Sequence, residues 1–146
     1  MRKFERVSYA PEGIILPTRA DKRSAGYDFY STEDFIIAPH ESYKTNTYIK
    51  AQMEDDEVLI LQVRSSIGIK RGLQLLNGNG IIDSSFYNSS ESEGNIVVGL
   101  YNRTDEPVEI RKGERIVQGI FLKYLVTNDD KPLSEERVGG VGSSGK

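Results

Sequence analysis

The chain has 146 residues, a formal net charge of −3 at neutral pH, no cysteine and a single histidine, His40. This length fits one domain that buries a core of its own. The lack of cysteine excludes disulfides, thiolate catalysis and cysteine-type zinc sites, and it suits a reducing cytoplasm. One histidine is too few for a His-based triad or a multi-histidine metal site within one chain.

Charge balance and hydropathy exclude two further partner classes. The 22 acidic residues outnumber the 19 basic ones, so the chain lacks the excess positive charge of a duplex-binding domain. We therefore expect no nucleic acid polymer as a partner. No apolar run approaches membrane-spanning length, and residues 1–5 lack the apolar core of a signal peptide. We expect a cytoplasmic protein without a membrane partner.

Short apolar stretches separated by turn residues follow one another along the chain. They predict strands, in order, over residues 7–16, 25–30, 35–38, 43–49, 58–63, 96–102, 107–110 and 116–125, with one helical turn at 66–72. No stretch has a convincing amphipathic helix pattern, so the sequence predicts an all-β sandwich or barrel. The polar residues 128–146 are expected to form a flexible tail behind a β-domain of residues 1–127.

Residues 76–83, Leu-Asn-Gly-Asn-Gly-Ile-Ile-Asp, contain the strongest local signal. Two successive Asn-Gly pairs between apolar residues predict a β-hairpin, because Asn and Gly accept the positive φ of tight primed turns. The stretch ends in Asp83, so a possible base lies beside backbone groups that can read the edge of a flat heterocycle. Taken alone, the stretch favours the plainer interpretation, a hairpin with a solvated aspartate.

Five stretches that carry glycine or charge lie at predicted strand ends or loops: 25–28, 64–70, 76–83, 113–118 and the Gly-rich tail from residue 137. An arginine beside serine hydroxyls suits polyphosphate recognition. A Gly-rich tail with one arginine can close over a phosphate chain. The carboxylates of Asp28 and Asp83 can serve a hydrated Mg²⁺ and an attacking water, respectively.

In this order the five stretches resemble the five motifs of the trimeric dUTPase family, from about residue 25 to residue 145. The resemblance implies a jelly-roll-like, distorted β-barrel that assembles as a homotrimer. Active sites in that family are shared between chains and closed by the C-terminal tail. The implied reaction is hydrolysis of dUTP to dUMP and pyrophosphate by water attack on the α-phosphorus, with Mg²⁺ as the cofactor.

The resemblance also implies a role for each matched residue. Asp83 would orient the catalytic water, Ser65 would donate near the scissile bridge, and Gln118 would lie near the water and the α-phosphate. Asp28 would hold Mg²⁺ through water, and Arg115 is expected to be a structural ion-pair partner. The expected substrate-binding residues are Arg64, Ser66, Asn77, Gly80, Ile82, Phe86, Arg137, Val141, Gly142, Ser143 and Ser144. Among these, Asn77 would read the uracil edge and Arg137 would clamp the γ-phosphate.

Three departures from the family pattern stand out. Phe86 replaces the usual tyrosine under the deoxyribose, and it keeps the steric wall against ribose because that rejection depends on the ring. Residues 88–93 form an insertion, for which a solvated turn is favoured over a partner-binding loop. Val141 replaces the tail phenylalanine that stacks on uracil.

Valine cannot stack, so Val141 is expected to weaken closure of the tail and to slow the reaction. A base–aromatic contact contributes about 1–3 kcal/mol, so Val141→Phe is expected to raise the rate of dUTP turnover more than about twofold. Steady-state kinetics of both proteins checks this, and a smaller response would contradict the role given to this position.

Two alternatives stay open from the sequence. A dCTP deaminase relative shares the fold and several motifs, but it carries a catalytic glutamate in the strand where this chain has Gly99. A dUTPase-like regulatory module that binds nucleotide fits Val141 and the acidic insertion. Such a binder would have little use for the full set of Asp28, Ser65, Asp83, Gln118 and Arg137. A deaminase would make a uracil nucleotide from dCTP, whereas a pure binder would saturate without product.

Overall fold

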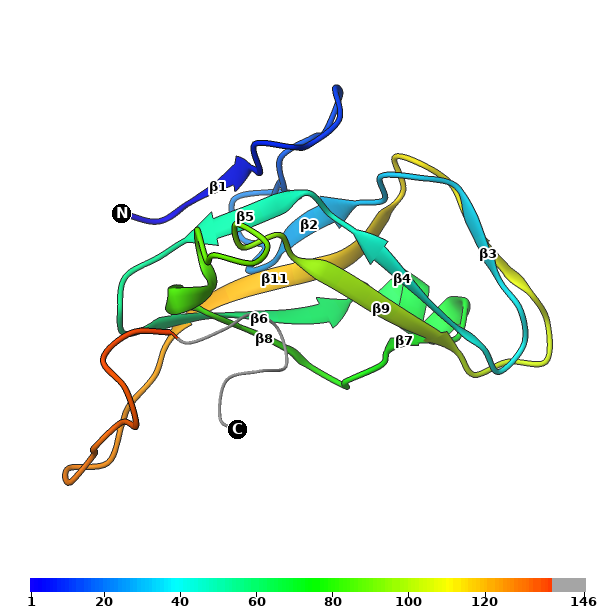
Figure 1. Cartoon of the computed structure of the whole chain (residues 1–146). Helices are drawn as coiled ribbons and strands as arrows, with labels where there is room; N and C mark the ends of the chain where they lie inside the picture. Colours follow the sequence, from blue (N-terminus) through cyan, green and yellow to red (C-terminus); the bar gives the residue numbers. More distant parts are fainter. Residues whose placement is uncertain (138–146) are drawn as a thin grey trace.

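A computed structural model describes residues 1–137, and within them the regular structure is almost entirely antiparallel β-strand (Figure 1). The strands are β1 (Lys3–Arg6), β2 (Tyr27–Tyr30), β3 (Phe35–Ile37), β4 (Ser42–Asn46), β5 (Ile49–Gln52), β6 (Glu57–Val63), β7 (Leu73–Leu75), β8 (Gly80–Asp83), β9 (Val97–Asn102), β10 (Val108–Ile110) and β11 (Arg115–Lys123). One π-helical turn (Ser66–Lys70) follows β6, and one 3-10 turn (Ser84–Phe86) follows β8. The all-β prediction is confirmed. No helix in this part of the chain has the length and apolar character needed to span a membrane.

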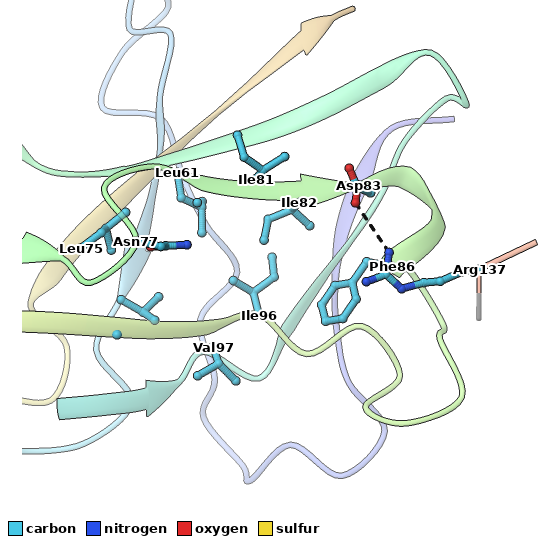
Figure 2. Close-up of a pocket in the computed structure, with 13 residues that line it drawn as sticks. Leu61, Leu75, Asn77, Ile81, Ile82, Asp83, Phe86, Ile96, Val97 and Arg137 are labelled. Atoms are coloured by element: carbon cyan, nitrogen blue, oxygen red, sulfur yellow. Dashed lines mark ion pairs between the residues drawn. The ribbon is translucent and has the colours of Figure 1, made fainter. Parts of the chain in front are cut away.

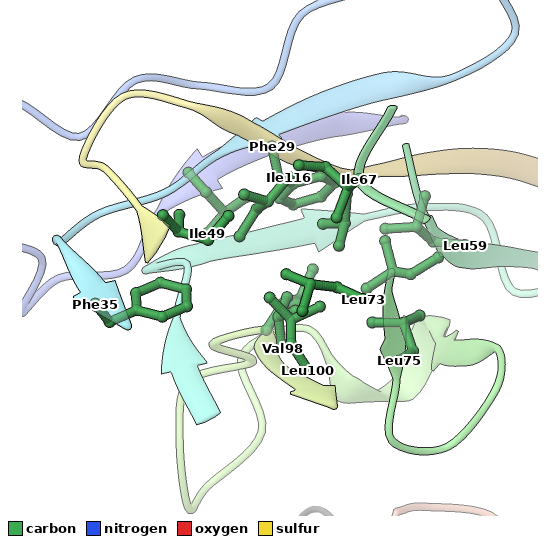
Figure 3. Close-up of a cluster of buried hydrophobic side chains, with 14 of the residues drawn as sticks. Phe29, Phe35, Ile49, Leu59, Ile67, Leu73, Leu75, Val98, Leu100 and Ile116 are labelled. Atoms are coloured by element: carbon green, nitrogen blue, oxygen red, sulfur yellow. The ribbon is translucent and has the colours of Figure 1, made fainter. Parts of the chain in front are cut away.

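Two larger sheets enclose the core. One has the strand order β2-β11-β6-β8, and the other has the order β4-β9-β7. Two ribbons, β1-β5 and β10-β3, extend this framework. Residues alternate between the two faces of each strand, so β6 buries Leu59 and Leu61 while Ile60 and Gln62 point outward. Buried side chains from both sheets meet between them (Figure 3), among them Phe29, Leu59, Leu73, Leu75, Val98, Leu100 and Ile116.

Two strand predictions near the N-terminus and the middle of the chain are wrong. The first strand is β1, which pairs with β5, and the predicted strand at 7–16 is not formed. Pro11 and Gly13 interrupt that segment, and Gly13 has a φ of +85°. The predicted strand at 43–49 divides at Tyr48, where φ is 59°, so β4 and β5 lie in different sheets. The Thr47 hydroxyl stabilises the bend by donating to the Ile96 carbonyl at 2.7 Å.

The hairpin prediction at 76–83 is correct for the turn and wrong for the pairing. Gly78 has a φ of +75°, and its N–H donates to the Leu75 carbonyl at 3.1 Å. The flanking strands do not pair with each other, however, because β7 pairs with β9 and β8 pairs with β6. The turn therefore carries the chain from one sheet to the other, and it leaves the two strands apart.

Candidate functional site

A cavity of about 230 Å³ lies where β7 and β8 separate (Figure 2). Apolar side chains form most of its wall, while Asn77 lies at one end and Asp83 with Arg137 at the other. The full lining is Leu61, Leu75, Asn77, Gly80, Ile81, Ile82, Asp83, Phe86, Ile96, Val97, Val98, Gly99 and Arg137. A narrow apolar slot with a few polar groups at its ends is typical of a small-molecule site.

Two glycines allow the backbones around this cavity to lie close to their neighbours. A Cβ at Gly80 would lie 2.9 Å from the Leu61 Cβ, and a Cβ at Gly99 would lie 2.7 Å from the Leu76 Cδ1. Both distances are shorter than real Cβ contacts, so a residue with a side chain would require Leu61 to move at the first position and the Leu76 side chain to move at the second. These glycines therefore allow β8 to pack closely against Leu61 of β6, and β9 to pack closely against Leu76.

The sequence-predicted residues Asp83, Phe86 and Arg137 meet at one end of the cavity. Asp83 is the last residue of β8 and precedes the 3-10 turn, which places the buried Phe86 ring in the wall. Arg137 Nη1 lies 3.6 Å from Asp83 Oδ2 and donates to Ser85 Oγ at 3.2 Å. Its guanidinium also lies over the Phe86 ring, 5.3 Å from the centroid.

A second group of predicted residues surrounds Asp28 at the other end of the four-stranded sheet. Asp28 on β2 is 6% exposed, and its Oδ1 lies 3.4 Å from Arg64 Nε. Its Oδ2 lies 3.4 Å from Arg115 Nη1, as expected of a structural ion pair. Gln118 on β11 stands opposite Asp28 in the ladder. A Cβ at Gly26 would lie 2.3 Å from Gln118 Oε1, so this glycine provides the space for the amide.

The two serines of the predicted phosphate-binding stretch lie beside this second group. Ser65 is exposed and precedes the π-helical turn, and its side chain accepts no capping hydrogen bond from the backbone of that turn. Ser66 is the first residue of that turn. The turn is fastened from the other sheet, because Arg103 Nη2 donates to the Gly68 carbonyl at 2.7 Å. The Ser65 hydroxyl thus lies at the surface on a fixed loop.

The two groups do not meet within one chain. Gln118 pairs with Gln62 and Asp83 pairs with Val58, so the groups lie four residues apart along β6, which corresponds to about 13 Å. The structure therefore forms two partial sites rather than one. The predicted residues Val141, Gly142, Ser143 and Ser144 lie outside the described residues.

The carboxylates of residues 1–137 form no cluster of three or more potential metal ligands. Asp28 is a lone carboxylate beside two guanidinium groups. Mg²⁺ commonly retains several waters and binds one or two carboxylates together with substrate phosphates. The donor set around Asp28 thus fits a water-mediated contact to a metal–phosphate complex, and it does not form a metal cage of its own.

Sequence reasoning missed several residues of the site. Ser85 accepts from Arg137, and the Gln62 amide hydrogen-bonds to Asn79 of the turn. Val97 and Val98 line the cavity from β9. Gln62 is signalled as the single polar residue in the otherwise apolar stretch 58–63, but nothing local links β9 to the turn at 76–79.

Comparisons with known proteins agree with this architecture. The family model described as dUTPase matches residues 12–145. The deoxyuridine 5'-triphosphate nucleotidohydrolase of Lactococcus lactis is 44% identical over 147 positions, which cover 99% of this chain and 98% of that protein. The crystal structure of dUTPase from Streptococcus mutans is similar with a TM-score of 0.80 at 37% identity, covering 86% of this chain and 98% of that chain. The dUTPase of phage phi11 of S. aureus is only 18% identical over 94% of this chain and 99% of that chain, so its TM-score of 0.74 supports the fold alone.

Proposed function

Because this chain belongs to the dUTPase family, we propose that its cavity and its Asp28 group together carry out the hydrolysis of dUTP to dUMP and pyrophosphate. The enzyme is thus a dUTP diphosphatase of nucleotide metabolism. The observation that carries the assignment of the site is that Asn77, Asp83 and Phe86, from one short stretch of sequence, line a single cavity. The Asn77 amide suits the edge of a nucleobase, and the Asp83 carboxylate suits a water or a sugar hydroxyl. The Phe86 ring suits the face of a sugar.

In this site the cavity residues select and orient the nucleoside. Asn77 and the close backbone of the turn bind the uracil edge, and the apolar wall with Ile82 holds the flat base. Phe86 lies under the sugar and leaves no room for a 2′-hydroxyl. Asp83 accepts a hydrogen bond from the attacking water, directs it at the α-phosphorus and, as general base, takes up its proton. This is positioning catalysis, in which alignment of the reacting atoms removes much of the barrier.

The Asp28 group supplies the contacts to the triphosphate. Arg64, Ser65 and Ser66 offer charged and neutral donors to the phosphate oxygens, on which negative charge increases in the transition state. Gln118 binds near the α-phosphate. The family uses a divalent metal ion, and we propose Mg²⁺, with Asp28 holding its water ligands. When bound, this ion would neutralise the charge on the phosphate oxygens.

The outer face of the four-stranded sheet supports assembly of two partial sites into one. By register, Val58, Ile60, Ile81, Ile120 and Leu122 share this face, and Ile81 and Leu122 are 57% and 51% exposed. An exposed apolar stripe of this kind marks an interface. Asp28 and Gln118 lie at one end of the face and Asp83 at the other. We propose a homotrimer in which the phosphate-binding group of one chain faces the cavity of the next, in the cytoplasm of a cell.

Leu122→Glu is expected to dissociate this assembly and to abolish dUTP turnover. An unpaired buried charge costs several kcal/mol, so we expect association at least about 100-fold weaker. The matched control is Ile36→Glu on β3, where the side chain is 63% exposed on a different sheet. Sedimentation velocity and pyrophosphate release report both effects. An active Leu122→Glu protein of unchanged mass would refute this interface.

Gly99 weighs against the deaminase alternative. The strand lacks the carboxylate that the deaminase reaction needs, and a glutamate there would bring its Cβ to 2.7 Å from Leu76 Cδ1, so the Leu76 side chain would have to move. The test of the proposed function is pyrophosphate release from dUTP, dCTP, dTTP and UTP, with Mg²⁺ and with chelator. Release from dUTP alone, dependent on the metal, is the expected result. Binding of dUTP without any product would favour the regulatory module.

A further inference from the structure

The insertion at residues 88–93, for which the sequence favours a solvated turn, is firmly attached to the N-terminal part of the chain. Glu93 Oε2 accepts from the Ser8 N–H at 2.8 Å and from Lys50 Nζ at 2.7 Å, and Oε1 accepts from the Ser8 hydroxyl. Lys50 Nζ also donates to Asn88 Oδ1 at 2.6 Å. The Tyr9 hydroxyl donates to the Ser92 carbonyl at 2.7 Å. A loop without a structural role would not need this many contacts.

The same loop is bonded directly to the backbone of Phe86. Ser89 N–H donates to the Phe86 carbonyl at 3.1 Å, and Glu93 N–H donates to the Ser89 carbonyl at 2.9 Å. Gly94 has a φ of +90°, and a Cβ there would lie 2.7 Å from the Phe86 carbonyl oxygen. Two successive backbone hydrogen bonds thus connect Glu93 to the Phe86 carbonyl.

The charged groups behind the Phe86 wall of the cavity are partly buried and contact one another or Tyr87. Lys50 and Glu93 side chains are only 12% and 25% exposed. Lys50 Nζ lies 5.2 Å from the centroid of the Tyr87 ring, and the Tyr87 hydroxyl donates to the Glu5 carboxylate. The hydrogen bond from Lys50, with those from Ser8, lowers the pKa of Glu93 from 4.5 to about 2. The Glu93 carboxylate therefore stays ionised well below neutral pH.

We propose that Glu93 is a positioning residue for sugar selection, which through its contacts with Lys50 and Ser8 holds the 88–94 loop and hence the Phe86 ring against a ribose 2′-hydroxyl. The inference rests on the proposed function, since it concerns the wall of the same cavity. An apolar pocket rejects an added hydroxyl only about 10²-fold. Rejection of ribose depends on a fixed Phe86 ring, because a ring that shifts outward makes room for the 2′-hydroxyl.

The experiment compares kcat/KM for dUTP and for UTP in wild type, Glu93→Gln, Lys50→Met and the double variant. Each single variant is expected to lower the dUTP/UTP ratio about fivefold, mainly by raising UTP turnover, while kcat for dUTP stays within about twofold. The double variant is expected to be no worse than either single one, because both remove the same pair. Lys50→Arg, which keeps the cation, is expected to retain the wild-type ratio.

Glu91→Gln is the matched control, since Glu91 is an exposed glutamate of the same loop. Its ratio is expected to equal that of wild type. A lower melting temperature in Glu93→Gln with an unchanged ratio would overturn the proposal and leave a purely structural role. If Glu93→Gln does not fold, Glu93→Asp and Lys50→Met carry the same comparison. If wild type does not hydrolyse dUTP, the proposed function fails separately, and the ratio of dUMP to UMP dissociation constants decides the role of Glu93.

Discussion

Asp83→Asn is expected to lower pyrophosphate release from dUTP by at least about 100-fold, because loss of a positioned base typically costs 10²–10⁴ in rate. The amide has nearly the shape of the carboxylate but cannot accept a proton from the attacking water. The Asp83 side chain is 58% exposed, so the fold is expected to tolerate the change. Binding of dUTP is expected to persist, and steady-state kinetics with equilibrium binding separates the two effects.

The matched control for this variant is Asp105→Asn. Asp105 has a side chain that is 95% exposed and pairs with His40 at the surface, away from the cavity. Its turnover of dUTP is expected to match that of wild type. A residual rate above about a tenth of wild type in Asp83→Asn would remove Asp83 from the catalytic role given to it here.

Phe86→Ala is expected to have the second large effect, on both specificity and stability. Removal of the ring opens the wall to a 2′-hydroxyl, so the dUTP/UTP ratio of kcat/KM is expected to fall by up to about 10². Phe86 is 5% exposed, and the cavity left by its truncation is expected to cost about 3–5 kcal/mol of unfolding free energy. Kinetics with both nucleotides and chemical denaturation measure the two losses.

Two further variants separate the specificity effect from the stability effect. Phe86→Tyr keeps the ring and restores the residue usual in the family, so its ratio is expected to stay at the wild-type value. Phe86→Leu keeps apolar volume without a planar wall, and it is expected to recover much of the stability but little of the selectivity. If Phe86→Ala rejected UTP as strongly as wild type, the wall would have to be a different residue.

Most of the fold could be predicted from local patterns. The apolar stretch at 58–63 predicts β6, and the stretch at 25–30 contains β2, because runs of β-branched, aliphatic or aromatic residues between turn residues are properties of a few neighbouring positions. The strand predictions fail where contacts with residues far away in the chain determine the local structure. Tyr48 takes a φ of 59° because the chain leaves one sheet for a ribbon, and no residue next to it signals that change. The tail boundary after residue 127 stays a prediction.

The candidate site shows the same division. Asp28, Asp83, Gln118 and Arg137 were predicted because they lie in short motifs that resemble those of a known family, and their roles stay predictions. The resemblance implied sites shared between chains, but the separation of the Asp28 and Asp83 groups within one chain came only from the structure. Glu93 illustrates the limit, because its partners Ser8 and Lys50 are 85 and 43 positions away along the chain. A charge within a polar loop resembles any solvated charge until those partners are known.

The sequence by itself determined the strand-rich architecture and the turn at 76–79, and it supplied the residues that we propose bind the nucleotide and its phosphates. These depend on backbone preferences and side-chain chemistry that act over a few residues. Only the tertiary structure decided that β7 and β8 separate to form the cavity, that Asp28 and Asp83 lie in different partial sites, and that the inserted loop is attached behind Phe86. These features depend on which distant strands pair and which charges meet, because contacts between residues far apart in the chain form only when the whole core packs.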